Sequence, residues 1–271
     1  MVSEVFRLHD VVYGYPDGRA GLSGVSLTVR QRESLVVLGA NASGKTTLLQ
    51  LLAGLAFPAS GRVEAFGEPL TEAVLREGRF ARSFRQRVGV LFQDTDAMLF
   101  NPTVYDEIAF GPLQLDLPEE DVRRRIDEMA ALFGLGMVMQ QPPHQLSGGE
   151  RKKVALAAIL AASPEVLLLD EPTSGLDPRS QRWFVELAGE LRAMGKTLVT
   201  TTHDLHVADE IGDRVVVLDE QHRAAADGRP RDILTDLDLL LSVNLVHEHA
   251  HVHDGIIHVH PHSHAHEHPH E

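Results

Sequence analysis

The segment GANASGKT, Gly39–Thr46, is the strongest constraint on what this chain can fold into. It lies between an apolar run of strand length, Leu35–Leu38, and a helical pattern over Lys45–Ala53. A glycine, four residues and then Gly-Lys-Ser/Thr in that setting is the pattern of a loop that cradles phosphates. Its glycines let the backbone wrap closely, so that N–H groups and the helix N-terminus face the negative charge. The segment therefore predicts a phosphate site in an α/β domain.

Within this loop, Lys45 is expected to reach the β- and γ-phosphates, and the Thr46 hydroxyl to bind Mg²⁺. The simpler alternative is a glycine-rich turn before an ordinary helix, and the strand–loop–helix order argues against it. The residues expected to surround the nucleotide phosphates are Gly39, Ala40, Asn41, Ala42, Ser43, Gly44, Lys45, Thr46 and Thr47.

A second motif, VLLLDEP at Val166–Pro172, delivers two acids to the end of an apolar strand. Ligands of parallel sheets bind at the carboxyl ends of the strands. Asp170 suits the Mg²⁺ shell of a phosphate-loop ATPase, and Glu171 is placed to polarise an attacking water as a general base. Alone, two acids here would more often be a solvated strand end. Beside a phosphate loop, the catalytic interpretation is the stronger one.

A third motif, LSGGE at Leu146–Glu150, precedes a helical pattern that begins with the basic residues Arg151–Lys153. A serine and two glycines at a helix start form an anion site from N–H groups and the helix dipole. Alone, this segment would more often be a capped helix start. LSGGE, then a strand ending in Asp-Glu, then SGLD is the motif order of an ABC ATPase.

Residues 1 to about 245 resemble the nucleotide-binding subunits of ABC transporters. Within them, FQDTDAMLFNPTVYDEIAFGPL (Phe92–Leu113) is most similar to the energy-coupling-factor group that imports cobalt and nickel. The stretch PPHQLSGGERKKVALAAILAASPEVLLLDEPTSGLDP is similar to that group along its whole length. The resemblance implies an ATPase with a mixed or parallel core sheet, an N-terminal antiparallel β part and an inserted helical subdomain.

The resemblance also assigns roles to single residues. It implies that Tyr15 stacks on adenine, that Gln93 senses Mg²⁺ and the membrane partner, and that His203 touches the γ-phosphate. Lys45, Glu171 and His203 would form the catalytic set. The alternatives to these functional roles are purely structural: a half-buried strand aromatic for Tyr15, a polar strand end for Gln93 and a structural histidine for His203. The residues implied to act across a head-to-tail sandwich of two subunits are Ser147, Gly148 and Gly149 over the opposite ATP, and Ser174–Asp177 between the sites. One departure is Glu150, where many relatives have glutamine.

Further periodic segments predict the remaining core. The expected strands are Val25–Val29, Val88–Phe92, Val166–Leu169, Leu198–Thr201 and Val215–Leu218, and the expected helices are Pro118–Phe133, Gly149–Ala162 and Pro178–Met194. The stretch from about 95 to 163 is poor in strands and is expected to be the helical subdomain of a domain spanning 1–245.

Composition limits the setting in which such a chain acts. A net charge of -14 argues against nucleic-acid binding, and the absence of cysteine excludes disulfides and thiolate metal sites. The N-terminus MVSEVFRLHD does not read as a signal peptide. No apolar run approaches the roughly 18 residues of a membrane span, so other chains would supply a membrane path. The resemblance to ABC transporter subunits then implies a peripheral protein at the cytoplasmic face of the cell membrane, bound to integral energy-coupling and substrate-capture subunits.

From Val246 the composition changes abruptly to a histidine-rich tail, residues 246–271, expected to be disordered. Imidazole suits nickel, cobalt, zinc and copper, and histidines that alternate along an extended strand lie about 7 Å apart on one side. A disordered, solubilising tail with incidental metal affinity is the alternative. A purification tag would instead be an unbroken run. The candidate tail ligands for nickel or cobalt are His247, His249, His251, His253, His258, His260, His262, His264, His266, His268 and His270.

Four functions follow from these features. The first is a coupling ATPase for nickel or cobalt import that works as a homodimer. The second is the same machine for zinc or a vitamin-like nutrient, which the tail disfavours. The third is a soluble metal-storage protein or chaperone that uses ATP as a switch. The fourth is a non-transport ABC ATPase of repair or translation, although two cassettes or a coiled-coil insertion are usual in that class and neither is found here.

Overall fold

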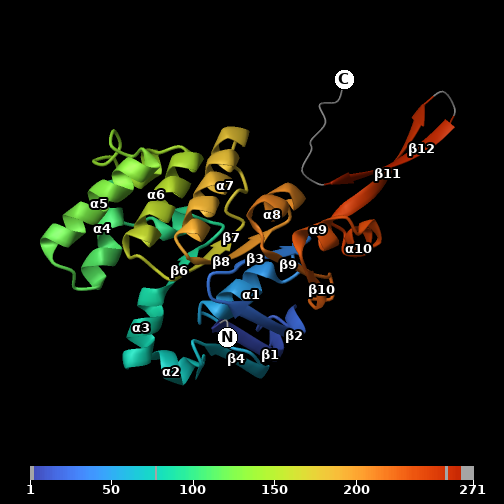
Figure 1. Ribbon diagram of the computed structural model, residues 1–271, viewed down its shortest axis with the longest axis horizontal. Helices are drawn as coiled ribbons and strands as arrows, with labels where there is room; N and C mark the ends of the chain where they lie inside the picture. The colour runs from blue at the N-terminus through green and yellow to red at the C-terminus, as the bar shows by residue number, and fades with distance from the viewer. Residues whose placement is uncertain (1–2, 77, 254–255, 264–271) are drawn as a thin grey trace. The chain divides into compact units, whose positions relative to one another are not determined.

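The computed structural model describes residues 3–76, 78–253 and 256–263, and for 247–253 and 256–263 it describes the backbone alone. The chain divides into two compact units, one formed by Met1–Thr71 with Val199–Glu271 and the other by Glu72–Leu198. Figure 1 labels the helices and strands of both.

The first unit contains a four-stranded antiparallel sheet in the order β2-β1-β4-β5. Its two long strands are joined by Tyr15-Pro16-Asp17-Gly18, a turn sequence in which Gly18 has a φ of 87°. Buried and exposed positions alternate along much of β2, as expected for a strand with one face on the core. The strands are β1 (Glu4–Gly14), β2 (Ala20–Arg30), β4 (Ser60–Ala65) and β5 (Glu68–Pro69).

The same unit contains the strands that carry the phosphate loop. Leu35–Leu38 in β3 are fully buried, which explains the unbroken apolar run, because parallel strands are covered on both faces. β3 pairs in parallel with β9, which pairs antiparallel with β10. The remaining elements are β3 (Ser34–Gly39), β8 (Thr197–Thr202), β9 (Arg214–Leu218), β10 (Ala224–Gly228), α1 (Lys45–Leu52), α8 (Leu205–Ile211), α9 (Pro230–Leu234) and α10 (Leu237–Ser242). Strand β8 crosses the boundary between the units.

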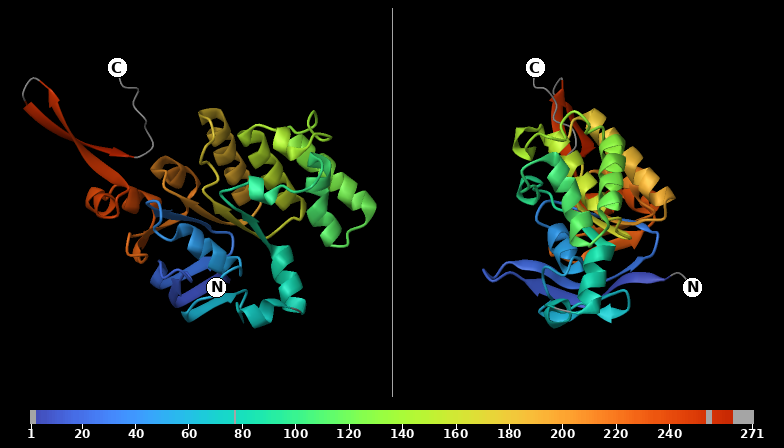
Figure 2. Two further views of the ribbon diagram at one scale, coloured as in Figure 1. Left: turned by 180° about the vertical axis from the view of Figure 1, so that it is seen from behind. Right: turned by 90° about the vertical axis from the view of Figure 1, so that its left-hand side faces the viewer.

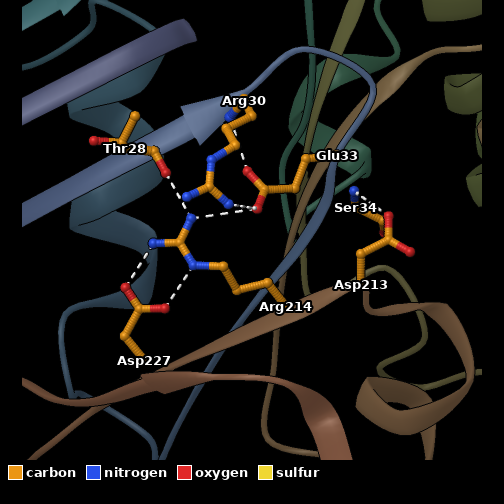
Figure 3. A network of polar contacts seen from close by, with 7 residues as sticks. All are labelled: Thr28, Arg30, Glu33, Ser34, Asp213, Arg214 and Asp227. Carbon is orange, nitrogen blue, oxygen red and sulfur yellow. Dashed lines mark hydrogen bonds and ion pairs between the residues drawn. The ribbon is translucent and has the colours of Figure 1, made fainter. Parts of the chain in front are cut away.

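A half-buried arginine, Arg214, joins β2, β9 and β10. The Arg214 guanidinium donates to both carboxylate oxygens of Asp227 at 2.5 Å, to the Thr28 carbonyl at 2.9 Å and to Glu33 at 3.3 Å (Figure 3). Arg30 approaches the same Glu33 carboxylate. The hydrogen bonds to Asp227 hold the pKa of Arg214 above its ordinary value. Because the charges are paired and hydrogen-bonded, this network can hold β2, β9 and β10 in place without an uncompensated buried ion.

The second unit is mainly helical. Strands β6 and β7 pair in parallel, and helices α4, α5 and α6 pack against one another (Figures 1 and 2). Gly89 on β6 lets the α6 side chain Ile159 approach, since a Cβ there would lie 2.5 Å from that side chain. The elements are α2 (Glu72–Arg76), α3 (Arg79–Arg87), β6 (Val88–Leu91), α4 (Val104–Gln114), α5 (Glu119–Phe133), α6 (Gly148–Ala161), β7 (Val166–Asp170) and α7 (Pro178–Ala193), with 3₁₀ turns at Asp96–Met98 and Pro143–Gln145.

The structure confirms the expected α/β class, with a separate antiparallel sheet, and every strand and helix expected from periodicity lies within about two residues of an observed one, apart from Val25–Val29, which belongs to the longer β2. None of the helices in the described ranges is long and apolar enough to cross a membrane.

In the histidine-rich tail, the backbone of the described residues pairs as an antiparallel hairpin of β11 (Val246–His253) and β12 (Ile256–Ser263) (Figures 1 and 2). The alternation of histidine with apolar residues has the period of a strand, and Asp-Gly between two such runs is a strong hairpin signal. Of the expected tail ligands, His264, His266, His268 and His270 lie outside the described residues.

Candidate functional site

The phosphate loop follows β3 in the first unit and folds around the lysine of its motif. The Lys45 ammonium donates to the carbonyls of Gly39 at 2.7 Å and Ala40 at 3.1 Å, and its side chain is 6% exposed. Ser43 N donates back to the Ala40 carbonyl at 3.2 Å. The Ser43 hydroxyl is buried and has no hydrogen-bond partner among the described residues. A buried hydroxyl without a protein acceptor fits a site whose ligand carries oxygens.

Backbone geometry explains why glycine is needed at the end of this loop. Gly44 has a φ of 105°, and a Cβ there would lie 2.3 Å from the Gly21 carbonyl oxygen. Gly44 is also the N-cap of α1, so no side chain caps that helix, and no acid lies in its first turn. The positive end of the α1 dipole is therefore left for an external anion. This arrangement fits a nucleotide phosphate.

Two further residues of the predicted site lie in the first unit. The Tyr15 hydroxyl is 2.7 Å from the Thr47 hydroxyl on α1, which places the half-buried ring beside the helix that follows the loop. The Arg19 guanidinium lies 5.3 Å from the centre of the same ring. His203 follows β8 directly and precedes α8, whose N-cap Asp204 accepts from two backbone N–H groups. The roles of Tyr15 and His203 towards ATP stay predictions.

In the second unit, β7 ends at the two acids of VLLLDEP. Asp170 is 2% exposed and Glu171 is 5% exposed. Glu171 has a φ of 44°, a left-handed conformation that is uncommon for a residue other than glycine. Such an outlier at the end of a parallel strand is typical of a functional position. A hydroxyl from Thr46 and a carboxylate from Asp170 are the donor types that Mg²⁺ prefers. These two residues belong to different compact units.

Sequence reasoning missed a buried lysine behind these acids. Lys152 on α6 is 5% exposed and donates to the Ser174 carbonyl at 2.9 Å, with the Glu171 carbonyl at 3.5 Å. Burial lowers the pKa of Lys152, and the charge of Glu171 opposes that shift. Lys152 therefore ties the LSGGE helix to the segment that follows β7. The available signal was weak, because Lys152 lies among the charged residues of Glu150–Lys153 at the start of the helix.

The LSGGE segment forms a capping box at the start of α6. Ser147 N and the Ser147 hydroxyl donate to the Glu150 carboxylate at 2.9 and 2.6 Å, and Glu150 N donates to the Ser147 hydroxyl at 3.3 Å. The hydrogen bonds from Ser147 lower the pKa of Glu150. Ser147 therefore caps α6 in this structure, and it is also a residue expected to contact the ATP of the opposite subunit.

The structure brings LSGGE and SGLD together within the second unit. A Cβ on Gly149 would lie 3.6 Å from the Ser180 hydroxyl, which itself donates to Asp177 at 2.6 Å. Asp177 is the N-cap of α7 and accepts from the backbone of Arg179 and Ser180. These hydrogen bonds, led by the Ser180 hydroxyl, lower the pKa of Asp177. Asp177 is therefore fully engaged as a cap in this structure, and Gly148 faces open space.

Gln93 follows β6 and is exposed at the start of a loop that leads to α4. The buried Glu107 on α4 accepts from Phe100 N at 3.1 Å and Asn101 N at 2.8 Å and so fixes the end of this loop.

The Phe100 ring meets Phe110 edge-on at 5.1 Å. Phe100 is 65% exposed. These rings lie at a cavity of about 230 Å³, lined also by Arg85, Met98, Ile159 and Pro164.

A second missed residue connects that loop to LSGGE. Arg151, in the first turn of α6, forms an ion pair with Asp96 at 2.6 Å and donates to the Leu146 carbonyl. The side chain of Arg151 is 26% exposed. The loop after Gln93 and the anion site of α6 are thus joined through one guanidinium.

Comparisons with known proteins agree with this geometry. The sequence profile of the ABC transporter family matches residues 22–174. The nickel import ATP-binding protein NikO of Rhodobacter capsulatus is 46% identical over 248 residues, which cover 90% of this chain and 97% of that protein. Two other relatives at 46% identity are named only as putative ABC transporter ATP-binding proteins.

Solved structures agree as well. CbiO1 of Clostridium perfringens, part of the ABC transporter complex cbiONQ, superposes with a TM-score of 0.75 at 33% identity and covers 90% of this chain and 95% of its own. A dimeric, post-hydrolysis structure of the ATP-binding cassette MJ0796 bound to ADP and Pi gives 0.74 at 27% identity and covers 83% of this chain and 99% of its own. With a phosphate loop, an acidic strand end and a capped LSGGE helix in the places this family requires, the chain belongs to the ABC transporter family and is one of its ATP-hydrolysing, ATP-binding subunits.

Proposed function

We propose that this chain is the energy-coupling ATPase of an importer, of the energy-coupling-factor type, for a transition-metal ion, nickel or cobalt. The observation that carries the ATPase is the phosphate loop, where Lys45 folds back on the loop carbonyls and α1 begins without a side-chain cap. The 46% identity to a nickel import protein over 90% of the chain supports the cargo and the direction. The likeness to CbiO1 supports the same class of transporter.

The residues of each unit have separate tasks in this proposal. The Lys45 ammonium leaves the Gly39 and Ala40 carbonyls for the β- and γ-phosphates of ATP, and Tyr15 stacks on its adenine. Thr46 of the first unit and Gln93 and Asp170 of the second are the residues that would hold Mg²⁺, which would supply charge neutralisation at the phosphate oxygens. Glu171 accepts a proton from the attacking water, and His203 contacts the γ-phosphate.

The start of α6 is proposed to act on the nucleotide of a second copy of the chain. In a head-to-tail homodimer, Ser147, Gly148 and Gly149 of one copy cover the ATP held by the phosphate loop of the other. The engagement of Asp177 with α7 keeps the segment between the two sites in a fixed position. The dimeric structure of MJ0796 supports this arrangement at a TM-score of 0.74. Hydrolysis removes the γ-phosphate bridge and allows the dimer to open.

The cavity beside Phe100 and Phe110 is the proposed contact with the membrane subunits. Its rings and apolar lining would take an apolar segment of an integral subunit. The ion pair of Arg151 with Asp96 connects this loop to the anion site of α6. A displacement of the loop by a membrane subunit would therefore also move the start of α6. In this proposal the protein acts peripherally at the cytoplasmic face of the cell membrane.

Metal uptake into vesicles tests the proposal. The chain is purified with the membrane proteins that accompany it and reconstituted, and ATP-driven accumulation of Ni²⁺, Co²⁺ and Zn²⁺ is followed by elemental analysis. The matched control is Glu171→Gln, which keeps the shape of the side chain and should lower hydrolysis about 10²- to 10⁴-fold through loss of the general base. Uptake of Ni²⁺ or Co²⁺ that disappears in the control supports the proposal. Intact ATPase activity in a membrane complex that moves neither metal would overturn the cargo.

A further inference from the structure

The hairpin at the end of the chain pairs histidine with histidine. Its register sets His247 opposite His262, His249 opposite His260 and His251 opposite His258. Residues two apart on a strand share a face, and residues directly opposite across an antiparallel pair share it too. These six positions therefore lie on one face of the β11–β12 ribbon, called here the histidine face.

The other face carries different chemistry. The pairs between the histidine rungs are Glu248 with Pro261, Ala250 with Val259 and Val252 with Ile257. Two of these three pairs are wholly apolar, and none includes a histidine. A register shift of one residue would set histidine against these residues at every rung. Strand register, and not composition alone, thus creates the histidine face.

We propose that the histidine face, where the register sets histidine positions of β11 directly opposite histidine positions of β12, is a binding site for divalent transition-metal ions. Cβ atoms directly opposite in an antiparallel pair are about 4.5–5.5 Å apart, and metal–imidazole bonds are about 2.0–2.1 Å long. One rung therefore sets two histidine positions close enough together to share one ion, and two neighbouring rungs set four. Imidazole is a ligand that nickel, copper, zinc and iron accept. Among the side chains that the structure describes elsewhere in the chain, no group of three or more His, Asp or Glu residues could hold a metal ion.

Metal binding and strand pairing should stabilise each other. An isolated two-stranded hairpin is marginally stable in water, and a site assembled from both strands exists only when they are paired. Ligand binding to the paired state then stabilises it by mass action. This site goes beyond the proposed import function, because it requires neither uptake nor a particular cargo.

A composition-matched permutation tests the register directly. The variant carries Ile257→His, His258→Ile, Val259→His and His260→Val, so it keeps every residue type, the net charge and a His-x-His spacing in β12. Two of the three rungs are lost because the moved histidines would face Val252 and Ala250. Titration of the full-length chain with Ni²⁺ alone should show the first ion bound at least about tenfold more weakly than in the unaltered chain. An unchanged affinity would overturn the proposal, because a tail of unordered imidazoles is indifferent to this permutation.

A second pair of variants locates the site with equal numbers of histidines removed. The inner variant changes His249, His251, His258 and His260 to glutamine, and the outer variant changes His264, His266, His268 and His270 to glutamine. We expect the inner variant to lose the tight site and the outer variant to keep its affinity within about twofold. Equal losses in both would overturn the proposal.

Hydrogen exchange gives a readout that does not depend on affinity. Ni²⁺ should slow exchange of the backbone amides of Val246–His253 in the full chain and in the outer variant, and should leave them unchanged in the permuted variant. Because these measurements use the isolated chain without membrane subunits, their failure leaves the import proposal intact. Failure of vesicle uptake likewise leaves this site intact.

Discussion

The two helix N-termini that face phosphate in an ABC ATPase are built in opposite ways in this chain. In the first unit, α1 begins after Gly44 with no side-chain cap and no acid in its first turn. In the second unit, α6 begins after Ser147, and the Glu150 carboxylate accepts from that residue's N–H and hydroxyl. One end is open to an anion, and the other is already covered by an anion of its own.

This difference predicts the order in which the two helix ends engage ATP. The open end can take up the ATP phosphates with only the Lys45 ammonium changing partners, because the helix N–H groups and dipole are not engaged by a side chain. The covered end must release the Ser147 hydroxyl from Glu150 before that hydroxyl can donate to a phosphate. We therefore expect the phosphate loop to determine ATP affinity and LSGGE to determine closure and turnover.

The largest expected difference comes from one glycine at each end. Gly44→Ala introduces a Cβ at a φ of 105° and 2.3 Å from a carbonyl oxygen, so it should cost about 3 kcal/mol of unfolding free energy and at least about 100-fold in ATP turnover. Gly148→Ala meets open space and should change the unfolding free energy by less than about 1 kcal/mol. Denaturant unfolding of both variants measures this, and equal destabilisation would contradict the comparison.

Removal of the Ser147 hydroxyl should separate turnover from binding. Ser147→Ala removes the proposed phosphate donor and the helix cap, so ATP turnover should fall about 100-fold, with about 1 kcal/mol lost in stability. Binding of a fluorescent ATP analogue to the isolated chain should stay within about twofold, because the phosphate loop is untouched. Ser147→Thr keeps both the hydroxyl and the cap and is the matched control. A large loss of binding in Ser147→Ala would show that LSGGE contributes to the first step.

Neutralising the covering carboxylate should favour closure. Glu150→Gln keeps an acceptor for Ser147 but removes a negative charge beside the incoming phosphate, so the KM for ATP should fall about threefold, the size of an exposed charge interaction. Glu150→Asp keeps the charge and should show no such fall. Steady-state ATPase assays measure the effect, and it should shrink at high salt because exposed charges are screened. A KM that rises in Glu150→Gln would refute the idea of a covered site.

The smallest effect should appear on acidification. The pKa of Glu150 is lowered below its ordinary value of 4.5 by Ser147, so its contribution to stability is present above pH 4.5 and is lost as the pH falls through the lowered pKa. Protection of the first α6 turn from hydrogen exchange, corrected for intrinsic rates, should therefore decrease below pH 4.5. The first turn of α1 has no acid and should change less. The same loss at both ends would mean global acid unfolding instead.

Much of this molecule could be predicted from its sequence because its signals are local. The phosphate loop, β7 and α6 combine uniform burial or strong periodicity with short motifs, and all three lie where they were expected. Lys152 and Arg151 were missed because their roles depend on partners 22 and 55 residues away, and no periodicity reports such pairs. The β11–β12 pairing was not predicted because the tail was assessed by its composition, although the Asp-Gly step and the period of two indicate paired strands.

The left-handed backbone of Glu171 has a consequence for how this protein can change over time. Asparagine and glycine adopt that conformation at lower cost, but neither carries the carboxylate that we propose as the general base. A selection for heat resistance alone would therefore favour an inactive residue at 171, and activity must be selected for directly to keep the glutamate. Engineering for thermal stability should keep Glu171 and introduce stabilising substitutions at other positions of the chain.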